Sequence, residues 1–377
     1  METDSSAGHL DDPRGEAPMF ASSPMIIKMR KLIPHQRANT RDPEVRNPAL
    51  KRRGGVIRYF LGIDSGATKI EVSLINDEIG LIETTSLNKS GNPAVVSLER
   101  FCENISEAIM IIISKSDISK IHGIGIGLAG YLEGRWNNDI KKCLYERLNI
   151  DPETVIIFED IYAAHVSTHL LGDGVIGILG TGSNFYGRCK GSFWRVGGWG
   201  HYIDDRGGAY SFGARGLSIV VRSLDGRIGY TKLVEYALDF YKADDVHKLV
   251  SKIYSSEDPK SMIASFAPYV FKAFREKDLY ATKIVEEEVS EIILAISTVY
   301  RRLGCLDIPL GIIGSLYREN KNVLKKMIEE GLERELGMKI EIQDPKIRQS
   351  CASALIMLKE RGFLDKELFD KIVRRCS

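Results

Sequence analysis

Two strand–turn–strand segments with small, hydroxyl-rich turns constrain the fold of this chain most. The first runs through the strand-like residues 56–63, the turn 64–68 and an alternating segment from Ile70. Small residues and a lysine are typical of a phosphate-binding P-loop, but a P-loop leads into a helix, whereas alternating apolar and polar residues predict a strand. We therefore predict a β-hairpin whose turn directs consecutive backbone N–H groups toward phosphate oxygens. A plain glycine turn is the alternative.

A second hairpin repeats this pattern in the other half of the chain. Residues 174–179 form a predicted strand, 180–183 a tight Gly-Thr-Gly-Ser turn, and 184–189 the return strand. Two related halves that face each other could hold one polyphosphate from both sides. The repeat therefore favours a nucleotide clamp over a plain turn.

Helices alternate with strands between the two hairpins. Apolar spacing predicts helices over 97–114 and 138–148, and strands over 121–130 and 155–158. This alternation indicates an α/β fold with a mostly buried sheet. Because 377 residues, 44% of them hydrophobic, exceed what one core usually serves, we expect two domains with a cleft between them.

Charge and cysteine content narrow the class of function. A formal net charge of +1 supplies no basic field, so we expect no nucleic-acid partner. The six cysteines include no CxxC pair and follow no secretory signal, which predicts reduced, mostly buried thiols in a cytoplasmic protein. The apolar run 105–113 is interrupted by Glu107 and is too short to span a membrane. We expect a soluble protein without a membrane partner.

Residues 1–55 differ in composition from the rest of the chain. They begin acidic and rich in Pro, Gly and Ser, then become basic, with little apolar periodicity. This composition predicts a mostly disordered or loosely attached extension, and a basic targeting arm is the alternative. A start codon assigned too early would give the same composition, with Met25 or Met29 as the true start.

Four motifs, which include the two hairpin turns, point to a family when they are taken in order. They are Asp64-Ser65-Gly66-Ala67-Thr68-Lys69, Gly180-Thr181-Gly182-Ser183-Asn184, Gly197-Gly198-Trp199-Gly200-His201 and Gly311-Ile312-Ile313-Gly314-Ser315. In order and spacing they resemble the N-acetylglucosamine kinase family within the BadF/BadG/BcrA/BcrD-type ATPases, which belongs to the superfamily of sugar kinases and actin. The resemblance runs from about residue 56 to the C-terminus.

The resemblance implies a two-domain actin-like ATPase (ribonuclease H-like) fold of the α/β class. Each domain would be a mixed sheet flanked by helices, with the nucleotide in the interdomain cleft. We predict a smaller domain over 56–171 and a larger one over 172–349. The C-terminal residues 350–377 should pack back on the first domain, as the apolar spacing of Ala354, Leu355, Met357 and Leu358 also suggests.

The resemblance also implies roles for the residues that match its motifs, with ATP and Mg²⁺ as cofactors. Asp64 would lie near the Mg²⁺ ion, and Asn92 would bind the sugar from the smaller domain. The implied ATP-binding residues are Gly66, Thr68, Lys69, Gly180, Thr181, Gly182, Gly314 and Ser315. The implied sugar-binding residues of the larger domain are Ser183, Asn184, Gly198, Trp199, Gly200 and Asp205.

The chain departs from the family pattern at two places. Where the family has Gly-Asp-Glu-Gly, it reads Asp204-Asp205-Arg206-Gly207, with a base in place of an acid beside the sugar site. This change puts sugar specificity in doubt more than the fold. Ser65 and Ala67 stand where glycines are common, which restricts the backbone of the first turn without removing its anion-binding concavity.

Asp160 is the candidate catalytic base. A sugar hydroxyl needs a carboxylate to accept its proton during phosphoryl transfer, and Asp160 follows the predicted strand 155–158, at the carboxyl end where α/β sites gather. Asp160 could instead merely cap the following helix, because Asp is a favoured N-cap residue. The resemblance of residues 159–164 to the family's strand end supports the catalytic role and a contact with the sugar. We expect the neighbouring Glu159 to point away.

Several other conspicuous residues have simpler interpretations. Trp199 could fill a core, but an indole on a glycine-rich loop also suits stacking against a sugar. His165, His169 and His201 lack the acidic or thiol partners of a metal site. We interpret residues 286–288, three glutamates, and Arg301-Arg302 as solvated helix faces.

Three functions remain. The leading hypothesis is an ATP-dependent kinase that transfers the γ-phosphate to a hydroxyl, expected to be the 6-OH, of N-acetylglucosamine, glucosamine or glucose. The alternatives are an ATPase activator of a dehydratase or reductase, which needs cysteine ligands that this spacing does not offer, and a nucleotide-dependent regulator. We expect a homodimer, although the sequence fixes neither the assembly nor the sugar.

Overall fold

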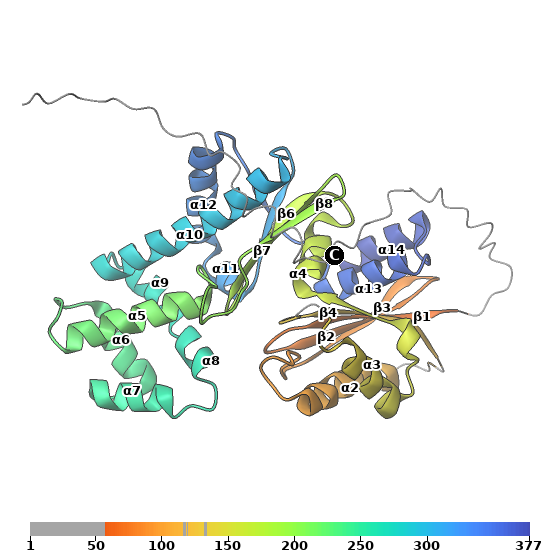
Figure 1. The fold of residues 1–377 in the computed structure, drawn as a ribbon, viewed down its shortest axis with the longest axis horizontal. Helices are drawn as coiled ribbons and strands as arrows, with labels where there is room; N and C mark the ends of the chain where they lie inside the picture. The colour runs from red at the N-terminus through yellow and green to blue at the C-terminus, as the bar shows by residue number, and fades with distance from the viewer. Residues whose placement is uncertain (1–56, 116–117, 119, 132–133) are drawn as a thin grey trace, which may run out of the picture. The chain divides into compact units, whose positions relative to one another are not determined.

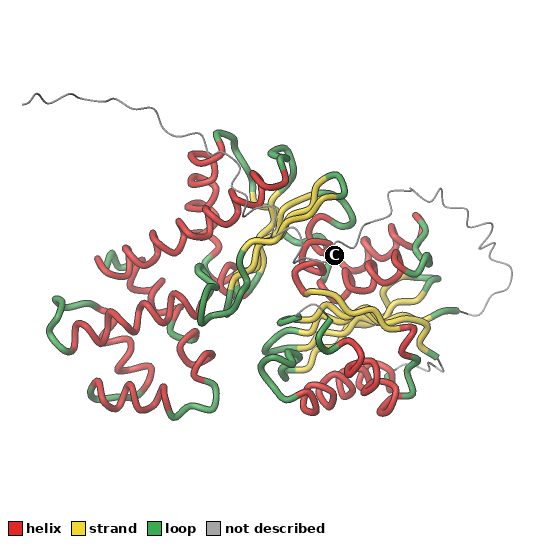
Figure 2. The backbone as a smooth tube through the Cα atoms, in the orientation of Figure 1, coloured by secondary structure: helices red, strands yellow, loops and turns green. Residues whose placement is uncertain are grey.

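The structure is a computed structural model that describes residues 57–115, 118, 120–131 and 134–377. This part of the chain contains two five-stranded mixed sheets flanked by helices (Figures 1 and 2). The predicted α/β class is therefore confirmed. The predictions for residues 1–55 lie outside the described residues, and the domain boundaries and the interdomain cleft stay predictions.

The first sheet is built around its first strand. Its order is β3-β2-β1-β4-β5, with β2 antiparallel to both β1 and β3 and with β4 parallel to both β1 and β5. The predicted first hairpin is confirmed, because Ser65 pairs with Ile70 across its turn. The strands are β1 (Tyr59–Ser65), β2 (Ile70–Asn76), β3 (Gly80–Leu87), β4 (Ile121–Leu128) and β5 (Val155–Glu159).

The second sheet repeats this topology. Its order is β10-β9-β6-β7-β8, with β6 antiparallel to β7 and parallel to β9. The predicted second hairpin is confirmed by the pairing of Leu179 with Ser183. The strands are β6 (Gly174–Leu179), β7 (Ser183–Cys189), β8 (Ser192–Val196), β9 (Leu310–Ile313) and β10 (Ile342–Gln343). The repeat seen in the sequence at the two hairpins thus extends to all five strands.

Helices separate and cover the strands. In the first half, α2 and α3 share the apolar core under the first sheet, and α13 packs on its β1 and β4 strands (Figure 1). Helix α4 follows β5 directly and contacts β6, β7 and β9 of the second sheet as well as α13. The helices are α2 (Leu98–Ser114), α3 (Asn137–Leu148), α4 (Asp160–His169), α5 (Ala209–Leu224), α6 (Lys232–Tyr241), α7 (Val246–Tyr254), α8 (Pro259–Ala264), α9 (Ala267–Arg275), α10 (Leu279–Leu303), α11 (Ser315–Glu319), α12 (Lys321–Leu336), α13 (Gln349–Glu360), α14 (Lys366–Cys376) and the short η1 (Pro152–Thr154).

Glycines in the first sheet allow α13 to approach its backbone closely. A Cβ atom on Gly62 of β1 would lie 1.9 Å from the carbonyl oxygen of Ser350, and one on Gly125 of β4 would lie 2.2 Å from that of Ser353. Neither separation is sterically possible, so both positions need glycine. Helix packing thus explains the alternating glycines of β4, which are Gly123, Gly125 and Gly127.

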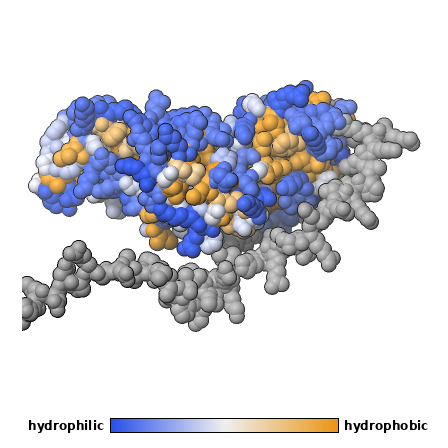
Figure 3. Space-filling model, turned by 90° about the horizontal axis from the view of Figure 1, so that it is seen from above, coloured by the Kyte–Doolittle hydropathy of each residue, from blue (hydrophilic) through white to orange (hydrophobic). Residues whose placement is uncertain are grey.

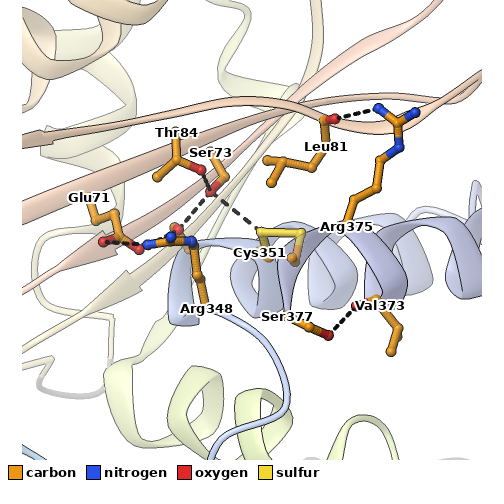
Figure 4. Close-up of a disulfide and its surroundings, with 11 residues drawn as sticks. Glu71, Ser73, Leu81, Thr84, Arg348, Cys351, Val373, Arg375 and Ser377 are labelled. Atoms are coloured by element: carbon orange, nitrogen blue, oxygen red, sulfur yellow. Dashed lines mark hydrogen bonds and ion pairs between the residues drawn. A yellow bond between two sulfur atoms is a disulfide. The ribbon is translucent and has the colours of Figure 1, made fainter.

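The six cysteines correct one prediction. They form three disulfides, Cys102–Cys143, Cys189–Cys305 and Cys351–Cys376, the last of which joins α13 to α14 (Figure 4). The prediction of buried cysteines is confirmed, but the prediction of reduced thiols is wrong. Sequence spacing detects only cysteines that are near in the chain, whereas here helix packing brings distant ones together.

No helix among the described residues is long and apolar enough to cross a membrane. The candidate run 105–113 lies within α2, where Phe101, Ile105 and Ile109 are buried under the first sheet. The hydrophobic stretch is therefore a core face of a helix.

Candidate active site

The turn of the first hairpin is closed by its own backbone and supported by a neighbouring loop. The N–H of Gly66 donates to the carbonyl of Lys69, and the hydroxyl of Ser65 donates to the carbonyl of Gly91 over 2.7 Å. The Lys69 ammonium lies 2.9 Å from the carboxylate of Glu71. Of the predicted ATP contacts here, Gly66 is half-buried, and Thr68 and Lys69 are exposed.

The loop that supports this turn carries Asn92, the predicted sugar ligand. Asn92 is buried, and a Cβ atom on Gly130, just after β4, would lie 2.6 Å from its Oδ1. Because Oδ1 accepts a hydrogen bond from the N–H of Ala94, the amide NH₂ is the group that could donate to a ligand. The fold therefore brings Asn92 next to the first turn.

Asp64 lies near the carboxyl end of β1 and is half-buried. Burial, the charge of Asp160 and the charge of Glu71 raise its pKa to about 7, against a lowering effect of Lys69. Glu71 faces Asp64 across the β1–β2 ladder. A cation beside Asp64 would favour its ionised form, which is the electrostatic condition for a metal ligand.

Asp160 begins α4 at the carboxyl end of β5 and interacts electrostatically with Asp64. Burial raises the pKa of Asp160 to about 6, and a hydrogen bond from the N–H of Ile161 opposes this rise. The charge of Glu159 raises this pKa further, and the charge of Arg195 lowers it. The N-cap position of α4 belongs to Glu159, not to Asp160. Two nearby carboxyl groups with raised pKa values are typical of functional sites.

The turn of the second hairpin rests on the segment that leads into α5. The N–H groups of Ala209 and Tyr210 donate to the carbonyls of Gly180 and Thr181, each over 2.9 Å. The hydroxyl of Ser183 donates to the carbonyl of Arg206 over 2.7 Å. The predicted ATP and sugar residues of this turn are thus fixed by residues 205–210.

Two glycines allow close approaches around the second turn. They bring Asp205 and Gly314, two predicted site residues, next to it. A Cβ atom on Gly182 would lie 2.3 Å from Oδ2 of Asp205, and one on Gly314 would lie 2.2 Å from the carbonyl oxygen of Leu179. Gly314 also has a φ of +111°, a conformation that L side chains rarely adopt. The structure therefore brings Gly314 against the second turn, and Ser315 follows it as the first residue of α11.

The loop 197–200 carries Trp199 between glycines. Gly197, Gly198 and Gly200 all have positive φ angles. A Cβ atom on Gly198 would lie 2.6 Å from the amide carbon of Asn184, whose buried Oδ1 accepts no hydrogen bond within the described residues. A buried acceptor without a donor is costly unless a ligand supplies one.

Several large apolar side chains are also exposed on and near this loop. Trp199 is 65% exposed, Tyr202 90% and Ile203 84%, and Phe193 on β8 is 65% exposed. Apolar patches lie among hydrophilic residues on the face drawn in Figure 3. Trp199 does not fill a core, so the alternative interpretation of this residue is wrong.

Arg195 of β8 is a site residue that the sequence analysis missed. Its guanidinium donates to the carbonyls of Gly197 and Gly198, over 3.3 Å and 2.6 Å, and lies 4.9 Å from the centre of the Trp199 ring. It also pairs with Glu159 over 3.1 Å. No motif marks this arginine, because its partners come from the end of β5 and from the following loop.

Arg206 pairs with an acid that the sequence analysis misinterpreted. Glu288 of α10 is fully buried and accepts from Arg206, from Arg215 and, over 2.7 Å, from the N–H of Gly207. Burial alone would raise the pKa of Glu288, but these hydrogen bonds lower it. The interpretation of residues 286–288 as a solvated face is therefore wrong for Glu288, although Glu286 is exposed.

The histidines have structural partners. His165 and His169 are buried on α4, and their Nε2 atoms contact the carbonyls of Gly174 and Val175. Burial lowers the pKa of His165 to about 3 and that of His169 to about 4. Within the described residues no cluster of three or more His, Cys, Asp or Glu side chains could hold a metal ion by itself.

Comparison with solved structures supports the fold. The chain resembles a protein from Chromobacterium violaceum whose assignment as an N-acetylglucosamine kinase is provisional, with a TM-score of 0.66, 20% identity, and coverage of 80% of this chain and 99% of that one. It also resembles a ROK-family glucokinase from Streptomyces griseus, solved with glucose and AMPPNP, with a TM-score of 0.50, 12% identity and coverage of 80% and 98%. These likenesses show that the chain shares its fold with both proteins.

Sequence comparison gives the family. The chain belongs to the BadF/BadG/BcrA/BcrD ATPase family, whose model matches residues 61–348. It is 30% identical over 257 residues, 66% of this chain and 81% of the relative, to an N-acetylmuramic acid/N-acetylglucosamine kinase from Clostridium acetobutylicum. It is 24% identical over 242 residues, 63% of this chain and 78% of the relative, to a glucosamine kinase from Vibrio cholerae. The resemblance drawn from the four motifs is confirmed.

Proposed function

We propose that this carbohydrate kinase transfers the γ-phosphate of ATP to the 6-OH of N-acetylglucosamine or a closely related amino sugar or hexose. That the chain is an ATP-dependent carbohydrate kinase follows from its family and from the kinases that it resembles. The choice of sugar is supported by the Clostridium acetobutylicum relative. The observation that carries the mechanism is the pair Asp160 and Asp64, two interacting carboxyl groups with raised pKa values at the strand ends of one sheet.

In this proposal Asp160 is the general base. The O–H bond of the sugar hydroxyl breaks, its proton passes to the Asp160 carboxylate, and its oxygen forms a bond to the γ-phosphorus as the bond to the β-phosphate oxygen breaks. A base works best when its pKa lies near the working pH, and the pKa of Asp160 is raised to about 6. Glu159 occupies the N-cap position of α4, and its side chain makes no cap hydrogen bond.

Nucleotide binding is assigned to the two turns. The first offers the Gly66 segment with Thr68 and Lys69, and the second offers the 180–183 backbone with Gly314 and Ser315 beside it. A bound Mg²⁺ would neutralise charge on the phosphate oxygens. Mg²⁺ is commonly held by one or two carboxylates together with phosphates rather than by a protein cage, so Asp64 fits this role although no three-ligand cluster exists among the described residues.

Sugar binding is assigned to Asn92 and to the loop residues near Trp199. The unpaired buried Oδ1 of Asn184 suits a hydroxyl or amide donor, and the NH₂ of Asn92 suits an acceptor. An exposed indole suits the apolar face of a pyranose ring. Together with Ser183, Gly198, Gly200 and Asp205, these groups would supply both polar and apolar contacts to one sugar.

The proposal is tested by measuring ADP release from ATP·Mg²⁺ with a panel of sugars. N-acetylglucosamine, N-acetylmuramic acid, glucosamine and glucose should be compared at equal concentration, with 6-deoxy-N-acetylglucosamine as the matched control. We expect the highest kcat/KM for N-acetylglucosamine and no sugar-dependent ADP release with the 6-deoxy sugar. Undiminished turnover of the 6-deoxy sugar would assign the reaction to another hydroxyl, and ADP release independent of every sugar would favour the ATPase alternatives.

A further inference from the structure

Arg195 contacts three separate parts of the candidate site with one side chain. Its Nη1 lies 3.1 Å from Glu159, its Nη2 and Nε donate to the carbonyls of Gly198 and Gly197, and its guanidinium stacks on the Trp199 ring. The side chain is 23% exposed, so water can replace these contacts only in part. Among the described residues, no other side chain forms hydrogen bonds with both Glu159 and the loop 197–200.

We propose that Arg195 is a positioning residue of the sugar site, which holds the Trp199 loop in its binding conformation and ties this loop to Glu159, the residue before the proposed base. This inference rests on the proposed function for its kinetic consequences, although the contacts themselves do not depend on it. It assigns a role to a residue that none of the recognised motifs contains.

The loop needs such a support because its backbone is intrinsically free. Gly197, Gly198 and Gly200 have positive φ angles, and glycine loses more conformational entropy on ordering than any other residue. Two carbonyl contacts and one stacked ring restrict this freedom before a ligand arrives. Ordering a binding surface in advance lowers the cost of binding.

The chemistry requires arginine. A planar guanidinium can donate in several directions and stack on an aromatic face at the same time, whereas an ammonium is a compact charge with three donors. Arg195 pairs with Tyr186 in the β7–β8 ladder, so its backbone is held in a sheet while its side chain reaches the loop. Lysine should therefore keep the ion pair with Glu159 but lose much of the loop support.

The first test uses Trp199 fluorescence without any substrate. Acrylamide quenching of Trp199 is measured in the wild type, Arg195→Ala, Arg195→Lys and Arg302→Ala. In each protein, the Trp199 emission is the part that is lost when Trp199→Phe is added. Arg302 is the matched control, because it stacks on Trp194 at 5.2 Å. We expect the quenching constant to rise clearly in Arg195→Ala, less in Arg195→Lys, and not at all in Arg302→Ala. Equal quenching in all four proteins would overturn the support of the loop.

The second test separates KM from kcat. In Arg195→Ala the KM for the sugar should rise by about tenfold to a hundredfold, as for the loss of one or two charge-assisted contacts, while the KM for ATP changes little. The Glu159→Gln variant and the double variant complete a cycle. If Arg195 acts partly through Glu159, the double variant should be little worse in kcat/KM than Arg195→Ala alone.

The two tests distinguish failure of the inference from failure of the proposed function. A protein that phosphorylates no sugar but shows the predicted change in Trp199 quenching would contradict the proposed function and leave the positioning role standing. A wild-type sugar KM in Arg195→Ala, or fully additive losses in the double variant, would overturn the proposed role. Circular dichroism of each variant checks that the fold is kept.

Discussion

Asp160 is the residue on which the proposed chemistry depends most directly. Asp160→Asn keeps the size of the side chain and a hydrogen bond to the sugar, but an amide oxygen is too weak a base to take the proton. We predict that kcat falls by about 10²–10⁴-fold, while sugar affinity stays close to that of the wild type. Steady-state kinetics, with sugar binding measured by calorimetry in the presence of a non-hydrolysable ATP analogue, checks this. Near-normal kcat would refute the assignment.

The raised pKa of Asp160 predicts a pH dependence at the same residue. Only the ionised carboxylate accepts a proton, and its pKa is about 6, so kcat should increase as the pH rises through about 6 and then level off. The measurement is kcat from pH 5 to 8 at saturating ATP, Mg²⁺ and sugar. This rise should be absent from the residual activity of Asp160→Asn. A kcat that is independent of pH over this range would contradict the prediction.

Asp64 should matter for turnover rather than for folding. Asp64→Ala removes an oxygen that we assign to the metal and its bound water, and it also relieves the burial and charge repulsion that raise the pKa of Asp64. We predict a large fall in kcat, a weaker dependence of activity on Mg²⁺ concentration, and an unchanged or higher midpoint of thermal unfolding. Unchanged turnover across a Mg²⁺ titration would show that the metal is held elsewhere.

At the scale of elements, Glu288 joins α10 to the segment before α5. Its carboxylate binds Arg206, Arg215 and the Gly207 N–H, and this segment in turn supports the second hairpin turn through Ala209 and Tyr210. Glu288→Gln should lower the free energy of unfolding by about 2 kcal/mol, because buried hydrogen bonds to a charged group are lost. It should also raise the KM for ATP.

The matched control for this prediction is Glu286→Gln. Glu286 lies on the same helix two residues away and is exposed, and a surface change of this kind costs within about 0.5 kcal/mol. Urea unfolding of both variants and their ATP kinetics give the comparison. Equal stability of the two variants would mean that Arg206 and Arg215 find other partners.

Elements were predictable to the extent that they depend on local pattern. The helix expected over 97–114 is α2, capped by Ser97, and the strand expected over 155–158 is β5. Both hairpins follow from alternation and turn composition. The acid partner of Arg206 was not predictable in this way, because Glu288 lies 82 positions further along the chain and its burial depends on tertiary packing. Arg195 was missed for a similar reason, since Glu159 is 36 positions away.

At the scale of the whole molecule, two buried histidines lie on α4, the helix that contacts both sheets. His165 and His169 have pKa values of about 3 and 4, lowered by burial, against 6.5 for the unperturbed group. The unfolded chain therefore binds more protons than the folded one below about pH 6.5, and these groups destabilise the fold as the pH falls from there toward 4.

The prediction is tested with urea unfolding at pH 7.5 and pH 5. His169→Gln keeps an amide donor near the Val175 carbonyl but does not titrate, so the loss of stability between the two pH values should be smaller in this variant than in the wild type. Carboxyl groups contribute equally to both proteins and cancel in the comparison. An identical pH dependence would show that His169 is not a source of acid sensitivity.

At this scale, the two related sheets were predictable from sequence only through the repeat and the family motifs. Two hairpins, one per half, indicated related sheets, and the motifs indicated which loops carry the site. Disulfide pairing was not predictable, because Cys189 and Cys305 are separated by 116 positions and meet only when α10 packs on the second sheet. Sequence periodicity predicts which face of a helix or strand is buried. It does not predict which distant helix or strand packs against that face.

The matching strand orders of the two sheets are those expected of an internal duplication. Duplication and fusion of one gene segment would leave two sheets with the same order and direction of five strands, and each sheet would begin with a hairpin. The two hairpins differ at one matching position: β1 carries Asp64 one residue before its end, whereas β6 carries the uncharged Ile178 there. With the roles proposed above, the first hairpin would bind the metal ion through Asp64, and the second hairpin would contact only the phosphates.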